Sequence, residues 1–225
     1  MRDLPTLLRN DRAASAAEFA LVLPILLLFL LGIVDAGRFI WDYNRAEKAT
    51  QMGVRYAVAT NPVAPGLSTY SFASAGVPAG NSVPTSSAVG TVWFASATCN
   101  NTTCNPTTSP CSGSSGICGG IGYNSTAFTN IVDRMRVFYP GITAANVEIE
   151  YRNLGLGYAG APDYEDPDNP GTTIYNSDVA PLVTVRLKNL TFRPITLLLF
   201  KQTSFNMPDF AAALTFEDGS GTVSN

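Results

Sequence analysis

The sequence predicts an α+β protein in which a long N-terminal transmembrane helix precedes a small extracytoplasmic domain, with a helix on an antiparallel sheet and a disulfide-bearing loop insertion. Three observations predict this class: an apolar run near the N-terminus, a cluster of cysteines mid-chain, and a mixture of helical and alternating patterns in the second half. We expect four parts: a cytoplasmic basic tail (1–12), the transmembrane helix with its extracytoplasmic extension (13–60), a Pro/Ser/Thr-rich cysteine-bearing insertion (61–125) and a C-terminal α+β domain (126–225).

The apolar run is the strongest feature. From Phe19 to Val34, 16 consecutive residues carry no charged or polar side chain. Counting back to Ala13 gives 22 positions, which at about 1.5 Å per residue reach about 33 Å, the thickness of a bilayer core. Pro24 removes one backbone hydrogen bond, which membrane helices tolerate as a kink.

The charges around the run predict its orientation. Arg2, Arg9 and Arg12 precede it, and no lysine or arginine follows until Arg38. Short basic flanks stay in the cytoplasm, whereas long distal domains translocate largely regardless of charge. We therefore expect a single-pass protein of the bacterial inner membrane with a cytoplasmic N-terminus and a periplasmic or extracytoplasmic C-terminal domain, either retained in the membrane or built into a surface fibre.

A cleaved secretory signal peptide is the alternative. Val34-Asp35-Ala36 resembles a small-x-small cleavage site behind a basic region. Against it, Glu18 stands at the entrance of the apolar run, and a helical pattern continues beyond Ala36 without proline as far as Ala59. This pattern predicts one helix over about 14–59, or an anchor followed by a separate helix. The expected stripe consists of Ala36, Ile40, Tyr43, Glu47, Ala49, Met52, Tyr56 and Ala59.

Four cysteines lie within 20 residues, at Cys99, Cys104, Cys111 and Cys118. Their spacing does not match the paired thiolates of a zinc site. An even number in a loop-rich segment favours two disulfides in an oxidising compartment, and three pairings are possible. The surrounding region, 61–125, is punctuated by proline and is expected to be irregular, with one short strand over 89–95.

Composition argues against several functional classes. The chain has no histidine, so the usual general base and the commonest transition-metal ligand are missing. Its net charge of −3 disfavours a nucleic-acid partner. The acidic stretch over 162–171 fails the EF-hand spacing and is interpreted as a solvated turn. The sequence indicates no catalytic residues, no metal and no cofactor, and a non-enzymatic protein.

Regular elements return after residue 125. Ser125 is a candidate N-cap for an amphipathic helix over 127–138, and strands are expected at 146–152, 182–190 and 205–216. The apolar segment 192–200 has nine residues, too few to span a bilayer. It is either a docking helix or a segment that lies on the membrane surface beside the anchor.

The N-terminal motif carries a resemblance to the TadE-like family. Members open with a short basic tail, a motif close to G-A-A-x-x-E-F-A-L-V-L-P and a Leu-rich run, and this chain reads A-A-S-A-A-E-F-A-L-V-L-P over 13–24. The resemblance covers residues 9 to 45 and implies a pilin-like outline for the external domain. It also implies a minor-pilin-like subunit or assembly factor, a pseudopilin in type, of a Flp (tight-adherence) pilus or related secretion apparatus.

The family resemblance also implies partners and site residues. These partners are other pilin-like and Tad assembly proteins and a prepilin peptidase, whose cut falls between Ala13 and Ala14; the family usually has glycine where this chain has Ala13. Glu18 and Phe19 are then the residues that set the axial register between neighbouring subunits. Glu18 is neutralised either by the α-amine of Ala14 on a neighbouring subunit or by the uncleaved tail.

The small residues Gly32, Ala36 and Gly37 permit close approach of other membrane helices. The alternative function is a membrane-anchored or secreted module for adhesion or binding, in which the cysteine loop reaches a surface.

Overall fold

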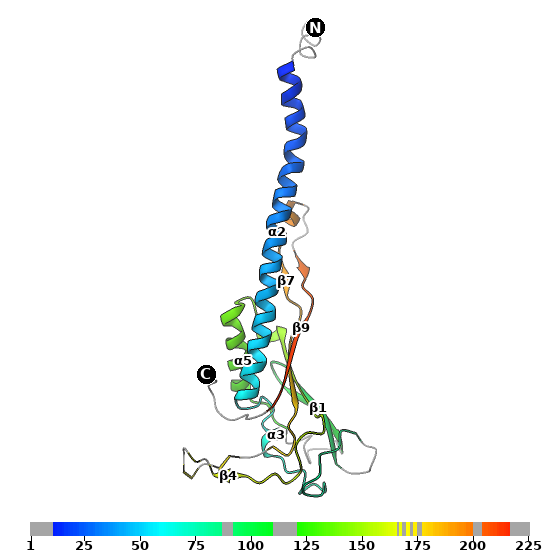
Figure 1. The fold of residues 1–225 in the computed structure, drawn as a ribbon, viewed down its shortest axis with the longest axis vertical. Coiled ribbons are helices and arrows are strands. Elements are labelled where there is room, and N and C mark those ends of the chain that lie inside the picture. Colours follow the sequence, from blue (N-terminus) through cyan, green and yellow to red (C-terminus); the bar gives the residue numbers. More distant parts are fainter. Residues whose placement is uncertain are drawn as a thin grey trace. The chain divides into compact units, whose positions relative to one another are not determined.

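The computed structural model describes residues 11–86, 92–109, 121–165, 167, 170–171, 173–174, 177–199 and 204–216 (Figure 1). The chain forms two compact units. Unit 1 contains residues up to Asn44 together with Thr191–Met207, and unit 2 contains Arg45–Leu190 together with the residues from Pro208 onward. One helix, α2 (Asp11–Ala59), contributes to both units. The prediction of one continuous helix, with Pro24 inside it, is therefore confirmed.

Unit 2 is built on a five-stranded antiparallel sheet with the strand order β2-β1-β3-β6-β9. Its strands are β1 (Trp93–Cys99), β2 (Cys104–Ser109), β3 (Val147–Arg152), β6 (Leu182–Leu187) and β9 (Phe210–Thr215). Ile149 pairs with Val185, which in turn pairs with Ala212. Alternate side chains of β3 are buried, as expected for a strand with one covered face. β6 buries Val183, Val185 and Leu187 on one face and also Thr184 between them. The α+β prediction is confirmed.

The C-terminal part of α2 and helix α5 (Ser125–Phe138) supply the helical layer of unit 2. α5 buries the apolar face predicted for it, including Phe128, Ile131 and Met135. Gly53 of α2 lies so close to Met135 and Val185 that a Cβ built on it would be 2.8 Å from the Met135 Cγ and 3.5 Å from the Val185 Cγ1. The core therefore lies where the two helices meet β6.

The predicted stripe on α2 is wrong in most of its members. Ala36, Ile40, Tyr43 and Glu47 are exposed, and of the stripe only Ala49 is buried. The buried line in unit 2 consists instead of Ala46, Ala49, Thr50, Gly53, Val54 and Ala57. This line consists mainly of small residues, which carry little hydrophobic signal but let another helix and a sheet approach closely.

The cysteine-bearing region is more regular than expected, because residues 93–99 and 104–109 form β1 and β2 and extend the main sheet. The register shifts between Phe94 and Ser96, which marks a bulge. A bulge breaks the alternation of a strand, so this signal could not be recognised as period 2. Cys111 and Cys118 lie outside the described residues.

Buried polar groups hold the loop over 61–86 against the sheet. The Asp178 carboxylate accepts hydrogen bonds from the backbone N–H groups of Phe72 (2.7 Å) and Gly160 (2.9 Å). The Asn153 amide donates to the carbonyls of Val83 and Phe94, at 3.0 and 2.9 Å. Backbone groups that lack a ladder partner are thus satisfied by side chains, as buried polar groups require. Among the described residues, unit 2 also contains two short helices, α3 (Gly66–Thr69) and η1 (Ala144–Asn146).

Several predicted boundaries change. The strand expected over 182–190 ends at Leu187. The N-cap of α5 is Asn124 and not Ser125, because the Asn124 side chain accepts the bond from the Ala127 N–H at 3.0 Å. The predicted strand over 205–216 is interrupted at Met207-Pro208, where proline has no N–H for a ladder. Its first part, β8 (Phe205–Asn206), pairs with β7 (Thr191–Phe192) in unit 1, and its second part is β9. Strand β4 (Tyr164–Glu165), in the acidic stretch, pairs antiparallel with β5 (Thr173–Ile174), which follows that stretch.

Candidate functional site

The first candidate site is the apolar surface of α2. Leu21, Ile25 and Phe29 are 75%, 70% and 67% exposed, and most of the other large side chains of the run are exposed as well. Soluble monomers rarely expose a contiguous apolar surface of this extent, which marks membrane or protein contact. Among the described residues, this is the one helix long and apolar enough to cross a membrane.

The predicted site residues are spread along this helix. Ala13 and Ala14 belong to its first turns, with side chains outside the described part. Glu18 is exposed, Phe19 is 64% exposed, and Glu18 forms no hydrogen bond or ion pair within the described residues. Gly32 and Gly37 are open, since a Cβ on either meets no atom within 4 Å, and Ala36 is exposed.

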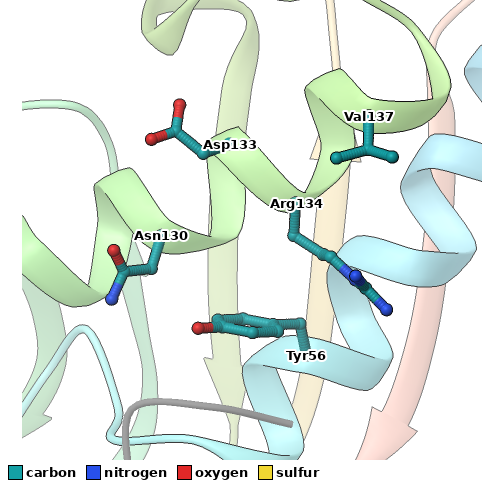
Figure 2. A pocket seen from close by; sticks show the side chains of 5 residues that line it. All are labelled: Tyr56, Asn130, Asp133, Arg134 and Val137. Atoms are coloured by element: carbon teal, nitrogen blue, oxygen red, sulfur yellow. The ribbon is translucent and has the colours of Figure 1, made fainter. Parts of the chain in front are cut away.

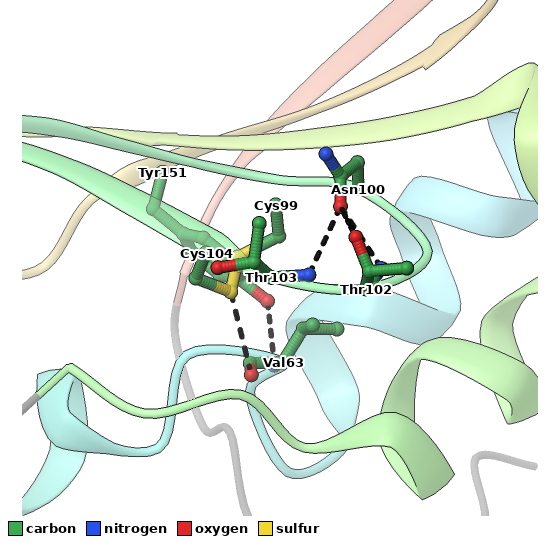
Figure 3. The surroundings of a disulfide bond; sticks show 7 residues. All are labelled: Val63, Cys99, Asn100, Thr102, Thr103, Cys104 and Tyr151. Carbon is green, nitrogen blue, oxygen red and sulfur yellow. Dashed lines mark hydrogen bonds between the residues drawn. A yellow bond between two sulfur atoms is a disulfide. The ribbon is translucent and has the colours of Figure 1, made fainter.

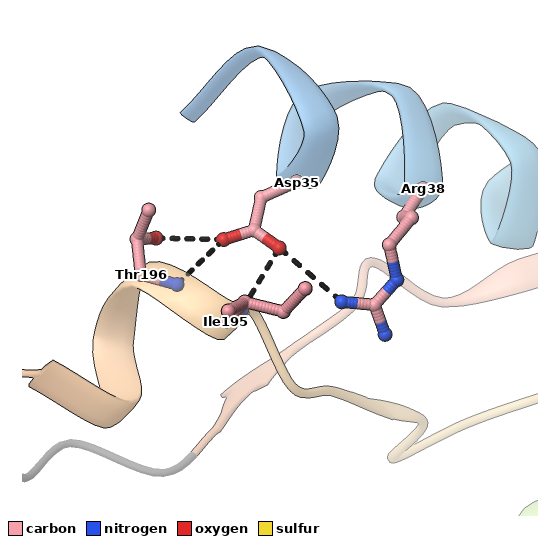
Figure 4. A network of polar contacts seen from close by, with 4 residues as sticks. All are labelled: Asp35, Arg38, Ile195 and Thr196. Carbon is pink, nitrogen blue, oxygen red and sulfur yellow. Dashed lines mark hydrogen bonds and ion pairs between the residues drawn. The ribbon is translucent and has the colours of Figure 1, made fainter. Parts of the chain in front are cut away.

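Asp35 is the site residue that the sequence analysis missed (Figure 4). One carboxylate oxygen accepts the backbone N–H of Ile195 at 2.8 Å, and the other accepts the N–H of Thr196 at 2.7 Å and its hydroxyl at 2.8 Å. Ile195 and Thr196 begin helix α6 (Ile195–Leu199), so Asp35 caps it from a distant part of the chain. The Arg38 guanidinium lies 3.2 Å from the same carboxylate, and Asp35 is only 6% exposed.

An aromatic cluster adjoins this network in unit 1. Phe39 of α2 contacts Phe192 of β7 and Phe205 of β8, with ring centroids 5.4 and 5.6 Å apart. Phe192 and Phe205 are themselves 5.5 Å apart, and Arg38 lies over the Phe192 ring at 5.6 Å. Aromatic pairs at these distances stabilise beyond the apolar area they bury. The apolar segment 192–200 indicates a docking element in the sequence, but nothing in that segment identifies Asp35 or Phe39 as its partners.

The second candidate site is the disulfide turn (Figure 3). Cys99 and Cys104 are bonded and close the turn between β1 and β2. Within the turn, the Asn100 side chain accepts from the N–H groups of Thr102 and Thr103, both at 2.9 Å. Beside it, the buried Tyr151 hydroxyl accepts the N–H of Val63 at 2.9 Å. One of the three possible cysteine pairings thus has Cys99 with Cys104.

A shallow groove of about 340 Å³ lies between α2 and α5 (Figure 2). Tyr56 faces it from α2, and Asn130, Asp133, Arg134 and Val137 line it from α5. Asp133 is paired with Arg136 at 2.9 Å. The groove holds no thiol and no second carboxylate, and no three His, Cys, Asp or Glu residues in the described ranges lie close enough together to bind a metal.

The fold and the exposed helix define a class: a chain whose N-terminal helix can cross a membrane and joins an antiparallel α+β domain. Residues 13–55 match the TadE family model, described as TadE-like protein, so this segment is a TadE-like family domain and the resemblance is confirmed there. The domain implies a protein associated with the Tad (Flp) pilus, in a family that is generally non-catalytic. No curated protein and no solved structure matches the chain.

Proposed function

We propose that this chain is a non-enzymatic, minor-pilin-like subunit or assembly factor of a Flp pilus or a related secretion apparatus. The observation that carries the proposal is the coincidence of the TadE-like segment at 13–55 with the exposed apolar helix that continues into the external unit. The helix acts in the inner membrane, with its N-terminus in the cytoplasm and unit 2 outside, where it meets other pilin-like and Tad assembly proteins.

Asp35 supports the retention of the helix in the mature protein. Signal cleavage after Ala36 would remove the carboxylate that holds the N–H groups of Ile195 and Thr196. It would also divide α2, which is continuous from Asp11 to Ala59. The anchored form therefore keeps unit 1 intact.

Lateral association of the helix is the proposed mode of action. Glu18 is exposed and without a partner in the described part of the chain. A lone carboxylate costs about 2.5–3.5 kcal/mol at the centre of a membrane helix and less toward its edge, so a cationic partner for Glu18 near the edge is favourable. The α-amine of Ala14 on a neighbouring subunit, set free by a prepilin peptidase, neutralises it and aligns the two helices. Gly32, Ala36 and Gly37 leave room for close approach.

N-terminal sequencing of the protein from purified membranes tests retention and processing together. A start at Ala14 supports cleavage between Ala13 and Ala14, and a start at Met1 supports an uncleaved anchor. A start at Gly37 refutes the anchored subunit and leaves a secreted protein.

Pilus counts in a deletion strain complemented with variants test the role of Glu18. We expect Glu18→Ala to reduce the number of pili per cell, because the charge that aligns neighbouring helices is lost. Glu47→Ala, which removes another exposed carboxylate from the same helix, is the matched control and should leave pilus number unchanged. Equal counts for wild type and Glu18→Ala would refute registration through this residue.

A second function, as an adhesive or binding module, is favoured by one loop. Leu154, Leu156 and Tyr158 are 47–48% exposed, although their loop is held by a bond from the Ala180 N–H to the Leu156 carbonyl at 3.1 Å. Gly157 has φ +85°, and a Cβ there would lie 2.8 Å from the Asp178 carbonyl. Changing all three apolar residues to serine should abolish attachment at normal pilus number if this function holds.

A further inference from the structure

Helix α6 starts beside the outer end of the apolar run. Asp35, which holds the N–H groups of Ile195 and Thr196, directly follows Val34, the last residue of the run. Figure 4 shows the first turn of α6 against this carboxylate. The start of α6 is therefore level with the point where the run ends.

The two strands that flank α6 in the sequence, β7 and β8, contact α2 further along the helix than Asp35. Phe192 and Phe205 pair across β7 and β8 and contact Phe39. Phe39 lies four residues beyond Asp35, about 6 Å along a helix. From β7 the chain thus extends along α2 toward the apolar run as far as Asp35, where α6 begins. β8, which follows α6 in the sequence, lies at the aromatic cluster again.

The amino-acid composition of the segment between Arg193 and Lys201 is suited to a lipid surface. Between Arg193 and Lys201 the sequence is P-I-T-L-L-L-F, in which Thr196 is the one polar residue. Its hydroxyl is bonded to Asp35. Ile195 is 39% exposed, like Ile33 (55%) and Val34 (51%) on α2. Apolar stretches with cationic flanks place their charges among headgroups and their apolar side chains below them.

An exposed tryptophan lies about 10 Å beyond the end of the apolar run on α2. Trp41 is 67% exposed and lies less than two turns beyond Val34. Tryptophan is enriched where the hydrocarbon core meets the headgroups, because its ring is apolar and its N–H is polar. The start of α6 thus lies between the end of the apolar run and Trp41 along α2, where the proposed function places the edge of the bilayer.

We infer that α6 is a membrane-interface helix that inserts its apolar residues at the headgroup–acyl boundary of the outer leaflet, beside the anchor. The inference rests on the proposed function, from which it takes the anchor. Asp35 and the aromatic cluster position α6, and α6 gives the chain a second lipid contact that sets the depth and rotation of α2.

The test uses the full chain with Trp41→Phe and Trp93→Phe, reconstituted in phosphatidylcholine–phosphatidylglycerol vesicles. Three single reporters are compared: Leu197→Trp on α6, Leu27→Trp in the apolar run and Val137→Trp on α5, where the native side chain is 69% exposed. Quenching is measured with lipids brominated near the headgroup end and near the middle of their acyl chains, and with aqueous acrylamide. We expect brominated lipid to quench Leu197→Trp at least about half as strongly as Leu27→Trp, and Val137→Trp hardly at all.

Each other outcome overturns the inference in a distinguishable way. If lipid quenches Leu27→Trp but acrylamide alone quenches Leu197→Trp, α6 lies in water while the anchor stands. If neither quencher reaches Leu197→Trp, protein covers α6, from a second copy or this chain. If lipid quenches neither reporter, the anchor and the proposed function fail as well. Circular dichroism checks the fold, and Ile195→Trp replaces Leu197→Trp if that variant misfolds.

Discussion

At the scale of single residues, Asp35 links parts of the chain that are 160 positions apart. A carboxylate beside an apolar run needs donors, and the free N–H groups of a helix start are strong ones. Because α6 is only five residues long, it has little stability of its own and depends on such a cap. Asp35 therefore acts on the placement of α6 more than on the helix to which it belongs.

Tyr151 predicts an alkaline pH dependence of stability. Burial raises the pKa of its phenol well above the ordinary value of 10.0, and the hydrogen bond from Val63 offsets only part of this effect. The unfolded phenol ionises near pH 10 and the buried one does not, so its contribution is complete below pH 10 and is lost as the pH rises further. Unfolding of the full chain in detergent, followed by near-UV circular dichroism, should show stability falling above pH 10.

The variant Tyr151→Phe separates the hydrogen bond from the packing. It should lose about 1–3 kcal/mol at neutral pH, because the buried Val63 N–H is left without an acceptor. It should also show a weaker decline above pH 10 than the wild type. Tyr158→Phe, at a 47% exposed position, is the control and should change neither quantity. A Tyr151→Phe variant as stable as wild type would contradict this account.

The Cys99–Cys104 disulfide predicts a modest loss on removal. The sequence separation is 5, and closing so short a loop stabilises by about 2 kcal/mol through the entropy of the unfolded chain. Cys99→Ala with Cys104→Ala should lower the melting temperature by about 4–8 °C. Peptide mapping of the non-reduced wild type should recover the Cys99–Cys104 pair, and a map joining Cys99 to Cys111 or Cys118 would contradict the structure.

At the scale of elements, α2 has two surfaces with different requirements. Over the apolar run its side chains are exposed and long, whereas in unit 2 its buried line consists mainly of small residues. The first surface is suited to lipid or to other helices, and the second to close contact with α5 and β6. One helix can meet both requirements because residues 11–44 and 45–59 belong to different units.

Glycine substitutions along α2 should have opposite effects in the two units. Gly53→Ala should destabilise by about 1 kcal/mol, because overpacking against Met135 outweighs the better helix propensity of alanine. Gly37→Ala, with no atom within 4 Å of the new Cβ, should be neutral or stabilise by up to about 1 kcal/mol. Thermal unfolding of both variants measures the difference, and a Gly53→Ala variant more stable than Gly37→Ala would refute the packing argument.

At the scale of the whole molecule, the distribution of charge and apolar surface predicts the topology. Protease added to intact spheroplasts should digest unit 2 and spare an N-terminal epitope tag, because the short basic tail stays in the cytoplasm. Lysed cells should lose both, which controls for access to the tag. Loss of the tag in intact spheroplasts would contradict the orientation.

The elements with strong periodicity could be predicted from the sequence. Strands β3 and β6 and helix α5 each bury an apolar face, so alternation or a 3.6-residue repeat identified them. The strand predicted over 89–95 covers β1 only as far as Ala95, because the bulge between Phe94 and Ser96 disrupts the alternation. The strand predicted over 205–216 is divided into β8 and β9, because Pro208 has no N–H for a ladder. The buried line of α2 was misplaced because alanine and glycine carry little hydrophobic signal.

The sequence by itself determined the membrane-compatible helix, the TadE-like segment and the α+β class, because composition and local period encode these directly. The tertiary structure alone decided that Asp35 caps α6, that Cys99 pairs with Cys104 and that Asp178 and Asn153 hold the loop over 61–86. Nothing in the sequence around these residues indicates which partner each of them contacts. Asp35, Asp178 and Asn153 bind backbone N–H or carbonyl groups, which almost every residue presents in the same form (proline lacks only the N–H), so that only folding selects among them. The cysteine pairing is likewise one of three that the sequence allows.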